Sequence, residues 1–346
     1  MRSFAAKAAS RTGVRLPANR AFERELAELE AMSGRELSAP DIERLQKVLG
    51  DDNNFLVSKA ARRVADAGLM QLLPEVQAAY ARFFDDAVKS DPQCWAKTEL
   101  AKALVRLECH DAELYIRGLR HIQEEPVWGG QSDTAGRLRA TCTHALVSCS
   151  SLSNAQLLDL LLEPLVDSDK TVRIEAARAI GHIGGINAAL LLKLRVLIGK
   201  EEPEVMGACF SALLSMDAER NASAITLVAG FLEDEDDIAG EAAFALAETH
   251  EASALTALIA RRRRNASPWL YSVLDHAIAL TRLADALEFL LNLLEHEPRQ
   301  AESVLEAISR VHQSAEVRER VEASVRRTDS SRALQAYRQF FPEDVG

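Results

Sequence analysis

The chain has 346 residues with 52 acidic and 41 basic side chains, and its formal net charge of −11 argues against wholesale wrapping of nucleic acid. Aromatic residues are scarce at 5%, while Ala, Leu, Glu and Arg are abundant, a composition that favours helices over sheet. The five cysteines lack the spacing of a disulfide framework, and no apolar run approaches the ~20 residues of a membrane span, so we expect a cytoplasmic protein without a membrane partner.

Residues 1–20 carry five basic side chains and no acidic one, and they lack the apolar core of a secretory signal. We therefore expect a basic tail at 1–20. A helix over 21–38 would follow it and cap an array of repeats.

A unit of about 31–42 residues, the size of a helical hairpin, recurs along the chain. Its clearest copy is DSDKTVRIEAARAIGHI at 167–183. The other copies lie at 51–67, 91–107, 133–149, 200–216, 233–249 and 295–311, with one more implied near 267–283 whose register is open. In each unit a leucine-rich helix such as NAALLLKLRVLIG ends in an acidic turn, and an alanine-rich second helix follows. In 167–183, Val172, Ala176, Ile180 and Ile183 form an apolar stripe at helical spacing.

The stretch DSDKTVRIEAARAIGHIGG resembles a HEAT repeat of the subtype also found in phycobilisome lyases, whose pattern is Asp, then Val-Arg, then Ala-Ala and Leu-Gly. The match is best at 167–202 and weaker elsewhere, where Lys97, Arg139 and Met206 take the place of Arg173. The resemblance implies an all-α fold, a right-handed α-α superhelix of about eight helical hairpins over 39–313. Capping helices at 21–38 and 314–346 would complete a single solenoid from 21 to 346, with the second helices lining its concave face.

The side chains of the second helices that avoid the apolar stripe form the predicted concave face, which begins basic and turns acidic at Asp237, Glu241 and Glu248. The predicted partner-binding residues are Lys59, Arg62, Trp95, Lys102, Arg106, Arg137, His144, Arg178 and His182. A tryptophan beside cations is a typical anchor, and the cations suit an acidic segment of a partner protein. An ordinary solvated helix surface is the alternative, and a small error of register would bury Trp95.

The longest turn within a repeat, QEEPVWGGQSDT at 123–134, is a second candidate binding site. It contains Pro126, Trp128, Gly129 and Gly130, and long loops of repeat proteins often lie on a binding edge. Equally favoured is a Trp128 that folds back over the adjacent turn.

Four consecutive arginines, Arg261, Arg262, Arg263 and Arg264, close a first helix. Acidic turns lie one repeat before them (Asp234 and Asp236) and one repeat after them (Glu295 and Glu297). Because neighbouring repeats stack about 10 Å apart, we predict a structural charge ladder, and a phosphate or partner site is the alternative.

No catalytic residue, metal ligand or cofactor is predicted. Deoxyhypusine hydroxylase, a HEAT-repeat iron enzyme, holds His-Glu pairs inside its second helices, whereas the pairs here, His250-Glu251 and His296-Glu297, fall at helix ends. We expect a non-catalytic scaffold or adaptor that binds a protein segment. The alternatives are a nucleic-acid-binding protein with a groove similar to that of HEAT-like DNA glycosylases and, less favoured, an enzyme that resembles bilin lyases.

Overall fold

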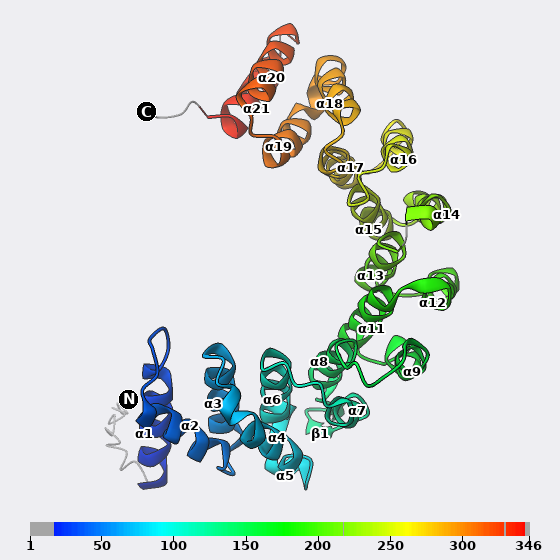
Figure 1. Cartoon of the computed structure of the whole chain (residues 1–346). Coiled ribbons are helices and arrows are strands. Elements are labelled where there is room, and N and C mark those ends of the chain that lie inside the picture. The colour runs from blue at the N-terminus through cyan, green and yellow to red at the C-terminus, as the bar shows by residue number, and fades with distance from the viewer. Residues whose placement is uncertain (1–16, 217, 329, 343–346) are drawn as a thin grey trace, which may run out of the picture. The chain divides into compact units, whose positions relative to one another are not determined.

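The computed structural model describes residues 17–216, 218–328 and 330–342, and Figure 1 shows that helices make up nearly all of them. The predicted all-α solenoid is confirmed, with one addition, a two-stranded hairpin. The chain separates into two compact units, Met1–Ser151 and Leu152–Gly346, and the single solenoid over 21–346 stays a prediction. Most of the predicted tail lies outside the described residues, and the first helix begins at Pro17 rather than at residue 21.

Unit 1 begins with the helix α1, and three stacked helical hairpins follow it along the chain: α2–α3, α4–α6 and α7–α8. The second helices α3, α6 and α8 pack side by side, and α2, α4 and α7 each pack on the second helix that follows. The elements are α1 (Pro17–Ala31), α2 (Ala39–Leu49), α3 (Asn54–Asp66), η1 (Met70–Leu72), α4 (Leu73–Arg82), α5 (Ala87–Ser90), η2 (Pro92–Cys94), α6 (Trp95–Arg106), α7 (Ala112–Leu119), β1 (Glu124–Val127), β2 (Gly130–Asp133) and α8 (Gly136–Leu146).

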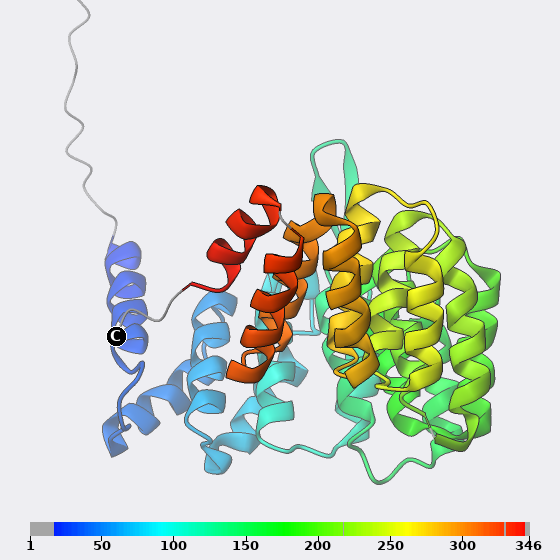
Figure 2. The ribbon, with the colours of Figure 1, turned by 90° about the horizontal axis from the view of Figure 1, so that it is seen from above.

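Unit 2 stacks five hairpins, α9–α11, α12–α13, α14–α15, α16–α17 and α18–α19, and ends in α20 and α21. The second helices α11, α13, α15, α17 and α19 form one layer and the first helices α12, α14, α16 and α18 the other (Figures 1 and 2). The elements are α9 (Asn154–Leu160), α10 (Leu162–Leu165), α11 (Lys170–Ile183), α12 (Gly185–Ile198), α13 (Pro203–Leu214), α14 (Ala218–Gly230), η3 (Phe231–Glu233), α15 (Asp236–Ala247), α16 (Ala252–Arg262), α17 (Pro268–Leu280), α18 (Ala284–His296), η4 (Pro298–Gln300), α19 (Ala301–Val311), α20 (Ala315–Arg327) and α21 (Ser331–Phe340).

The second helices begin where the repeat pattern places an acidic residue. In the copy at 91–107, the buried Asp91 carboxylate accepts hydrogen bonds from the backbone N–H groups of Ala96 and Lys97, at 2.8 and 2.9 Å. It also lies 3.1 Å from the buried Lys97 ammonium. A carboxylate at a helix start satisfies otherwise unpaired N–H groups, so the acid fixes the start of α6 and the cation at the Arg173 position compensates its charge.

Small residues allow the second helices to approach closely. A Cβ atom added to Gly181 of α11 would lie 2.7 Å from Cβ of Ala212 in α13, closer than two carbon atoms can approach without a shift of one helix. The small residues of the second helices therefore set the spacing between neighbouring repeats.

Candidate functional site

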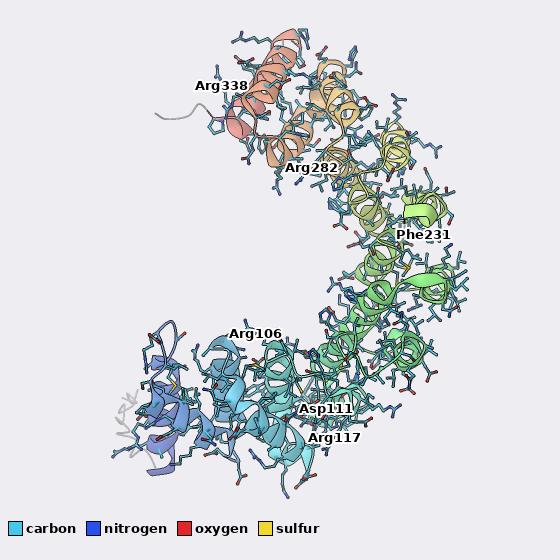
Figure 3. All side chains as sticks on the ribbon, viewed as in Figure 1. Arg106, Asp111, Arg117, Phe231, Arg282 and Arg338 are labelled. Atoms are coloured by element: carbon cyan, nitrogen blue, oxygen red, sulfur yellow. The ribbon has the colours of Figure 1, made fainter. Side chains whose placement is uncertain are left out.

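Seven of the predicted partner-binding residues lie in unit 1, on three adjacent second helices. Lys59 and Arg62 belong to α3, Trp95, Lys102 and Arg106 to α6, and Arg137 and His144 to α8. Figure 3 shows Arg106 on the α3–α6 side of the unit, whereas Arg117 lies on the α7 side. We call this surface the α3–α6–α8 face.

Trp95 lies at the surface of this face, and its side chain is 50% exposed. Its ring centroid is 5.6 Å from that of Phe55 on α3, and Phe55 in turn lies 6.1 Å from Phe22 on α1. The ammonium group of Lys59 lies 5.2 Å from the centre of the Phe55 ring, within cation–π range. The alternative repeat register, in which Trp95 would be buried, is therefore excluded.

The α3–α6–α8 face is less positive than its cations alone predict. Glu99 Oε2 lies 3.1 Å from Nη2 of Arg62 and Glu99 Oε1 lies 2.7 Å from Nζ of Lys102, while Asp66 pairs with Arg106. Burial raises the pKa of Glu99, but the hydrogen bonds from Lys102 and Arg62 outweigh burial and hold that pKa below its usual value.

Glu99 is therefore ionised at neutral pH. The five cations Lys59, Arg62, Lys102, Arg106 and Arg137 stand against the two carboxylates of Asp66 and Glu99, a formal net charge of +3. The face is therefore a mixed surface with a positive excess.

The predicted loop at 123–134 is a β-hairpin with Trp128 and Gly129 at its tip. Trp128 is fully exposed, so the alternative in which it folds back over the adjacent turn is wrong. Gly129 has a φ of 94°, a conformation that favours glycine, and Gly130 begins β2, opposite Val127. The hairpin extends past the helix ends (Figure 2).

A buried polar network fixes the base of this hairpin. The Glu125 carboxylate, next to Pro126, accepts hydrogen bonds from Gln93 N at 2.6 Å and from Thr134 Oγ1 at 2.7 Å. Across the hairpin, Asp133 Oδ2 lies 2.5 Å from Nη1 of the buried Arg139. The exposed tip is therefore held on a rigid base.

The four arginines do not form the predicted charge ladder with Asp234, Asp236, Glu295 and Glu297. Arg261 and Arg262 are buried: Arg261 Nε donates to the carbonyl oxygen of Leu232 at 2.6 Å, and Arg262 Nε donates to the buried Asp275 carboxylate at 2.6 Å. Arg264 pairs with Glu233 at 2.6 Å, and the Arg263 guanidinium lies 5.6 Å from the ring centre of Phe289. Consecutive helical side chains point about 100° apart, which is why four adjacent arginines reach different neighbours.

The acids predicted for that ladder have other partners. Asp234 accepts from the backbone N–H of Glu235, Asp236 from the hydroxyl of Ser267, and Glu297 from the amide of Gln300. Glu295 pairs with Arg327 of α20. The run Arg261–Arg264 thus holds α16 to its neighbours through Glu233, Asp275 and a backbone carbonyl.

The other two predicted partner-binding residues, Arg178 and His182, lie in unit 2 on α11. They line a groove of about 850 Å³ that runs over α11, α13 and α15, together with Glu204, Glu241 and Glu248. Arg178 pairs with Glu175 at 2.7 Å. Burial, and to a lesser degree the nearby Glu204, raises the pKa of the Glu241 carboxyl.

Sequence reasoning missed Trp269, the first large side chain of α17. It is 50% exposed, as Trp95 is, and its ring packs over Gly240 of α15, where an added Cβ would lie 2.9 Å from the ring. The signal was the pair Ser267-Pro268: Ser267 Oγ accepts from the N–H of Leu270 at 3.1 Å, and Pro268 occupies the first helical turn. That cap fixes the register left open near 267–283 and places Trp269 where Trp95 lies in its own repeat.

Stacked helical hairpins whose first and second helices form two layers define the class of α-solenoids. Residues 154–247 match the family model of HEAT repeats, so this part of the chain is built of HEAT repeats. The solved structure of human deoxyhypusine hydroxylase in complex with glycerol is similar, with 15% sequence identity, coverage of 78% of this chain and 92% of that chain, and a TM-score of 0.29. No curated protein matches the sequence.

Within 17–216, 218–328 and 330–342, no group of three or more His, Cys, Asp or Glu side chains is arranged to hold a metal ion. Nor is any helix in these ranges both long and apolar enough to cross a membrane.

Proposed function

We propose that the chain is a non-catalytic scaffold or adaptor that binds a segment of a partner protein along the α3–α6–α8 face. HEAT repeats commonly bind protein partners, and residues 154–247 are HEAT repeats by sequence. The observation that carries the proposal is the half-exposed Trp95, which lies against Phe55 among cations on a surface that packing in unit 1 leaves open.

The chemistry of the face defines the segment. Trp95 and Phe55 offer an apolar contact, and an aromatic anchor of this kind typically supplies a large share of binding energy. The positive excess on Lys59 and Arg137 suits carboxylates, which speed encounter and fix orientation. An acidic segment with one apolar side chain fits both features. Nucleic acid is the competing ligand, and Glu99 and Asp66 would repel its phosphates.

Affinity capture from native lysate with the whole chain, followed by mass spectrometry, tests the proposal. Trp95→Ala should remove the partner, with a loss of about 2–4 kcal/mol of binding free energy. Trp269→Ala is the matched control, because it removes an equally exposed tryptophan from the same repeat position in unit 2. An identical set of captured proteins for the wild type and Trp95→Ala would contradict the proposal.

The contribution of the cations to partner binding needs a double variant of its own. Arg62 and Lys102 share Glu99, so their reversal would disturb an existing ion-pair cluster as well as a binding surface. Lys59→Glu with Arg137→Glu avoids that cluster and should weaken capture while leaving the melting temperature unchanged. Salt-sensitive retention on immobilised duplex DNA, lost in the same double variant, would favour the nucleic-acid alternative instead.

A further inference from the structure

The first-helix layer of unit 2 carries an exposed apolar stripe on α12. Its side chains are between 58% and 68% exposed and follow one side of the helix: Ile186, Leu190, Leu194, Leu197 and Ile198. The opposite side, with Ala188, Leu192 and Val196, is buried within the unit. We call the exposed stripe the α12 face. A contiguous apolar surface of this kind is typical of an interaction site and not of a solvated helix.

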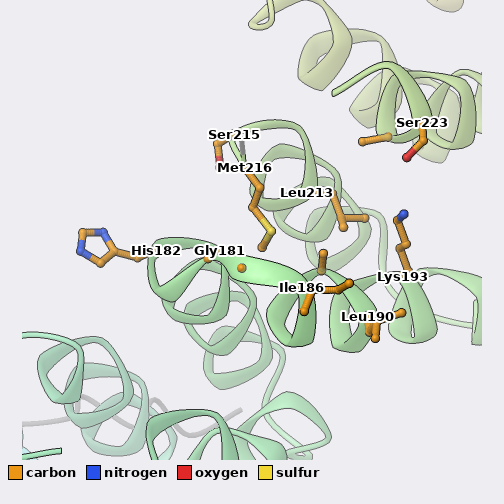
Figure 4. Close-up of a pocket in the computed structure, with 13 residues that line it drawn as sticks. Gly181, His182, Ile186, Leu190, Lys193, Leu213, Ser215, Met216 and Ser223 are labelled. Atoms are coloured by element: carbon orange, nitrogen blue, oxygen red, sulfur yellow. The ribbon is translucent and has the colours of Figure 1, made fainter. Parts of the chain in front are cut away.

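The α12 face continues into a groove between α12 and α14 (Figure 4). The groove encloses about 400 Å³. Ile186, Leu190 and Lys193 line it from α12, and Leu213 and Met216 add apolar lining from the end of α13 and the turn after it. Side chains that enter this groove would extend the apolar contact beyond the helix surface itself.

Lys193 gives the groove a charge preference. It is half-buried and forms no ion pair with any described residue, whereas Arg195, two positions further on, pairs with Glu201. A ligand that covers the groove removes water from the Lys193 ammonium, and an ammonium that loses water without gaining a counter-charge opposes binding. A ligand with a carboxylate at this point avoids that cost.

We propose that the α12 face and its groove bind an amphipathic helix of a partner protein that carries a carboxylate opposite Lys193. The stripe from Ile186 to Ile198 covers about 18 Å of helix, at ~1.5 Å per residue, which is enough for three turns of a partner helix. Pairing of α12 with a second copy of itself is disfavoured, because Lys193 lies near the middle of the stripe and would face its own symmetry mate. The proposal concerns a different surface from the α3–α6–α8 face and does not depend on it.

A charge-exchange experiment on the full chain tests the proposal. The probe is a fluorescein-labelled, helix-stapled peptide of 14 residues with leucines at i, i+4, i+7 and i+11 and a single Glu beside the stripe; a second peptide carries Lys in place of Glu. Fluorescence anisotropy should show that the Glu peptide binds about tenfold or more tightly than the Lys peptide. Lys193→Glu should reverse this preference, and Lys193→Gln should abolish it.

Substitutions of the stripe complete the test. Leu190→Gln with Leu194→Gln should weaken the Glu peptide about tenfold or more, because two apolar contacts are lost. Leu334→Gln, an exposed leucine on α21, is the control and should leave binding unchanged. Equal affinity of the two peptides for the wild type, or a preference that Lys193→Glu does not reverse, would overturn the proposal.

Two further measurements separate the other occupants. Sedimentation velocity measures whether the chain dimerises. If the wild type is a dimer and Leu194→Gln is a monomer, the α12 face binds a second copy and the proposal is overturned. If the wild type floats with phosphatidylcholine–phosphatidylserine vesicles and Leu194→Gln does not, the α12 face binds a membrane surface, and this result also overturns the proposal. A wild-type chain that is monomeric and does not float with the vesicles supports the proposal that the α12 face binds a partner helix.

Discussion

Arg262→Met should destabilise unit 2 far more than Arg263→Met, although the two arginines are neighbours in the sequence. Arg262 is buried, donates to the carboxylate of Asp275 at 2.6 Å, and lies with its guanidinium 4.4 Å from the ring centre of Tyr271. Asp275 is fully buried and also accepts from Ser303 Oγ at 2.7 Å. Arg263 is exposed and contacts the Phe289 ring.

The expected magnitudes follow from this difference in burial. Removal of one partner from a buried ion pair costs about 3–5 kcal/mol, because the remaining charge stays buried without compensation. Loss of an exposed arginine over an aromatic ring costs about 0.5–1 kcal/mol. Burial raises the pKa of Asp275, although the hydrogen bond from Arg262 opposes that shift. In Arg262→Met the pKa of Asp275 in the folded chain is raised further, because the opposing hydrogen bond is gone. The loss of stability is therefore complete at a pH above this raised pKa, and it disappears as the pH falls below the pKa of Asp275 in the unfolded chain.

Urea unfolding with a local probe measures the difference. Trp269 lies on α17, the helix of Asp275, and it becomes the sole tryptophan in a Trp95→Phe, Trp128→Phe background. A local probe is needed because repeat arrays can unfold in segments. Arg262→Met with Asp275→Leu should recover most of the loss, since no charge is left buried. Equal losses in Arg262→Met and Arg263→Met, or a loss under about 1 kcal/mol, would refute this reasoning.

At the hairpin, Trp128→Ala should change the free energy of unfolding of unit 1 by less than about 0.5 kcal/mol, whereas Asp133→Ala should lower it by about 3 kcal/mol in the same denaturation series, since it removes the carboxylate that compensates the charge of the buried Arg139. Gly118→Ala should cost about 1–3 kcal/mol, because the new Cβ would lie 2.2 Å from a tyrosine hydroxyl; Gly130→Ala, with open space around it, should be neutral in thermal melts. Burial raises the pKa of Cys142 to about 12, so this thiol and the four other buried cysteines should react with Ellman's reagent at pH 8 only when the chain unfolds, and immediate titration of the native protein would contradict the burial.

The fold could be predicted from the sequence because its information is local and periodic. An apolar stripe at helical spacing and small residues within it recur along the repeats, most of them with an acid before the stripe, and each feature has one structural purpose. The copy at 167–183 therefore corresponds to α11, which begins at Lys170. The repeat near 267–283 lacked the acidic start, and the Ser267 cap that replaces it gave the weaker signal.

The pairing of charged side chains could not be predicted, because it depends on neighbours that are distant in sequence. Arg262 reaches Asp275 on the next helix, and Arg62 of α3 reaches Glu99 of α6. The repeat register shows which positions lie at the surface, but a long side chain has several partners within reach. The apolar α12 face was also beyond prediction, since a leucine-rich first helix has the same pattern whether both of its sides are buried or one is open.

Register explains why two tryptophans remain exposed in a protein with so few aromatic residues. Trp95 and Trp269 occupy the same position at the start of a second helix, and both are 50% exposed, so exposure at this position follows from the stacking of repeats and not from the residue. Their electrostatic settings differ, however. Trp95 lies among the cations of the α3–α6–α8 face, whereas Trp269 packs on α15, which carries Asp237 and the half-buried Glu241 and is followed by Glu248. An acidic segment that binds beside Trp95, as we propose, would be repelled beside Trp269, so charge alone would distinguish the two tryptophan sites.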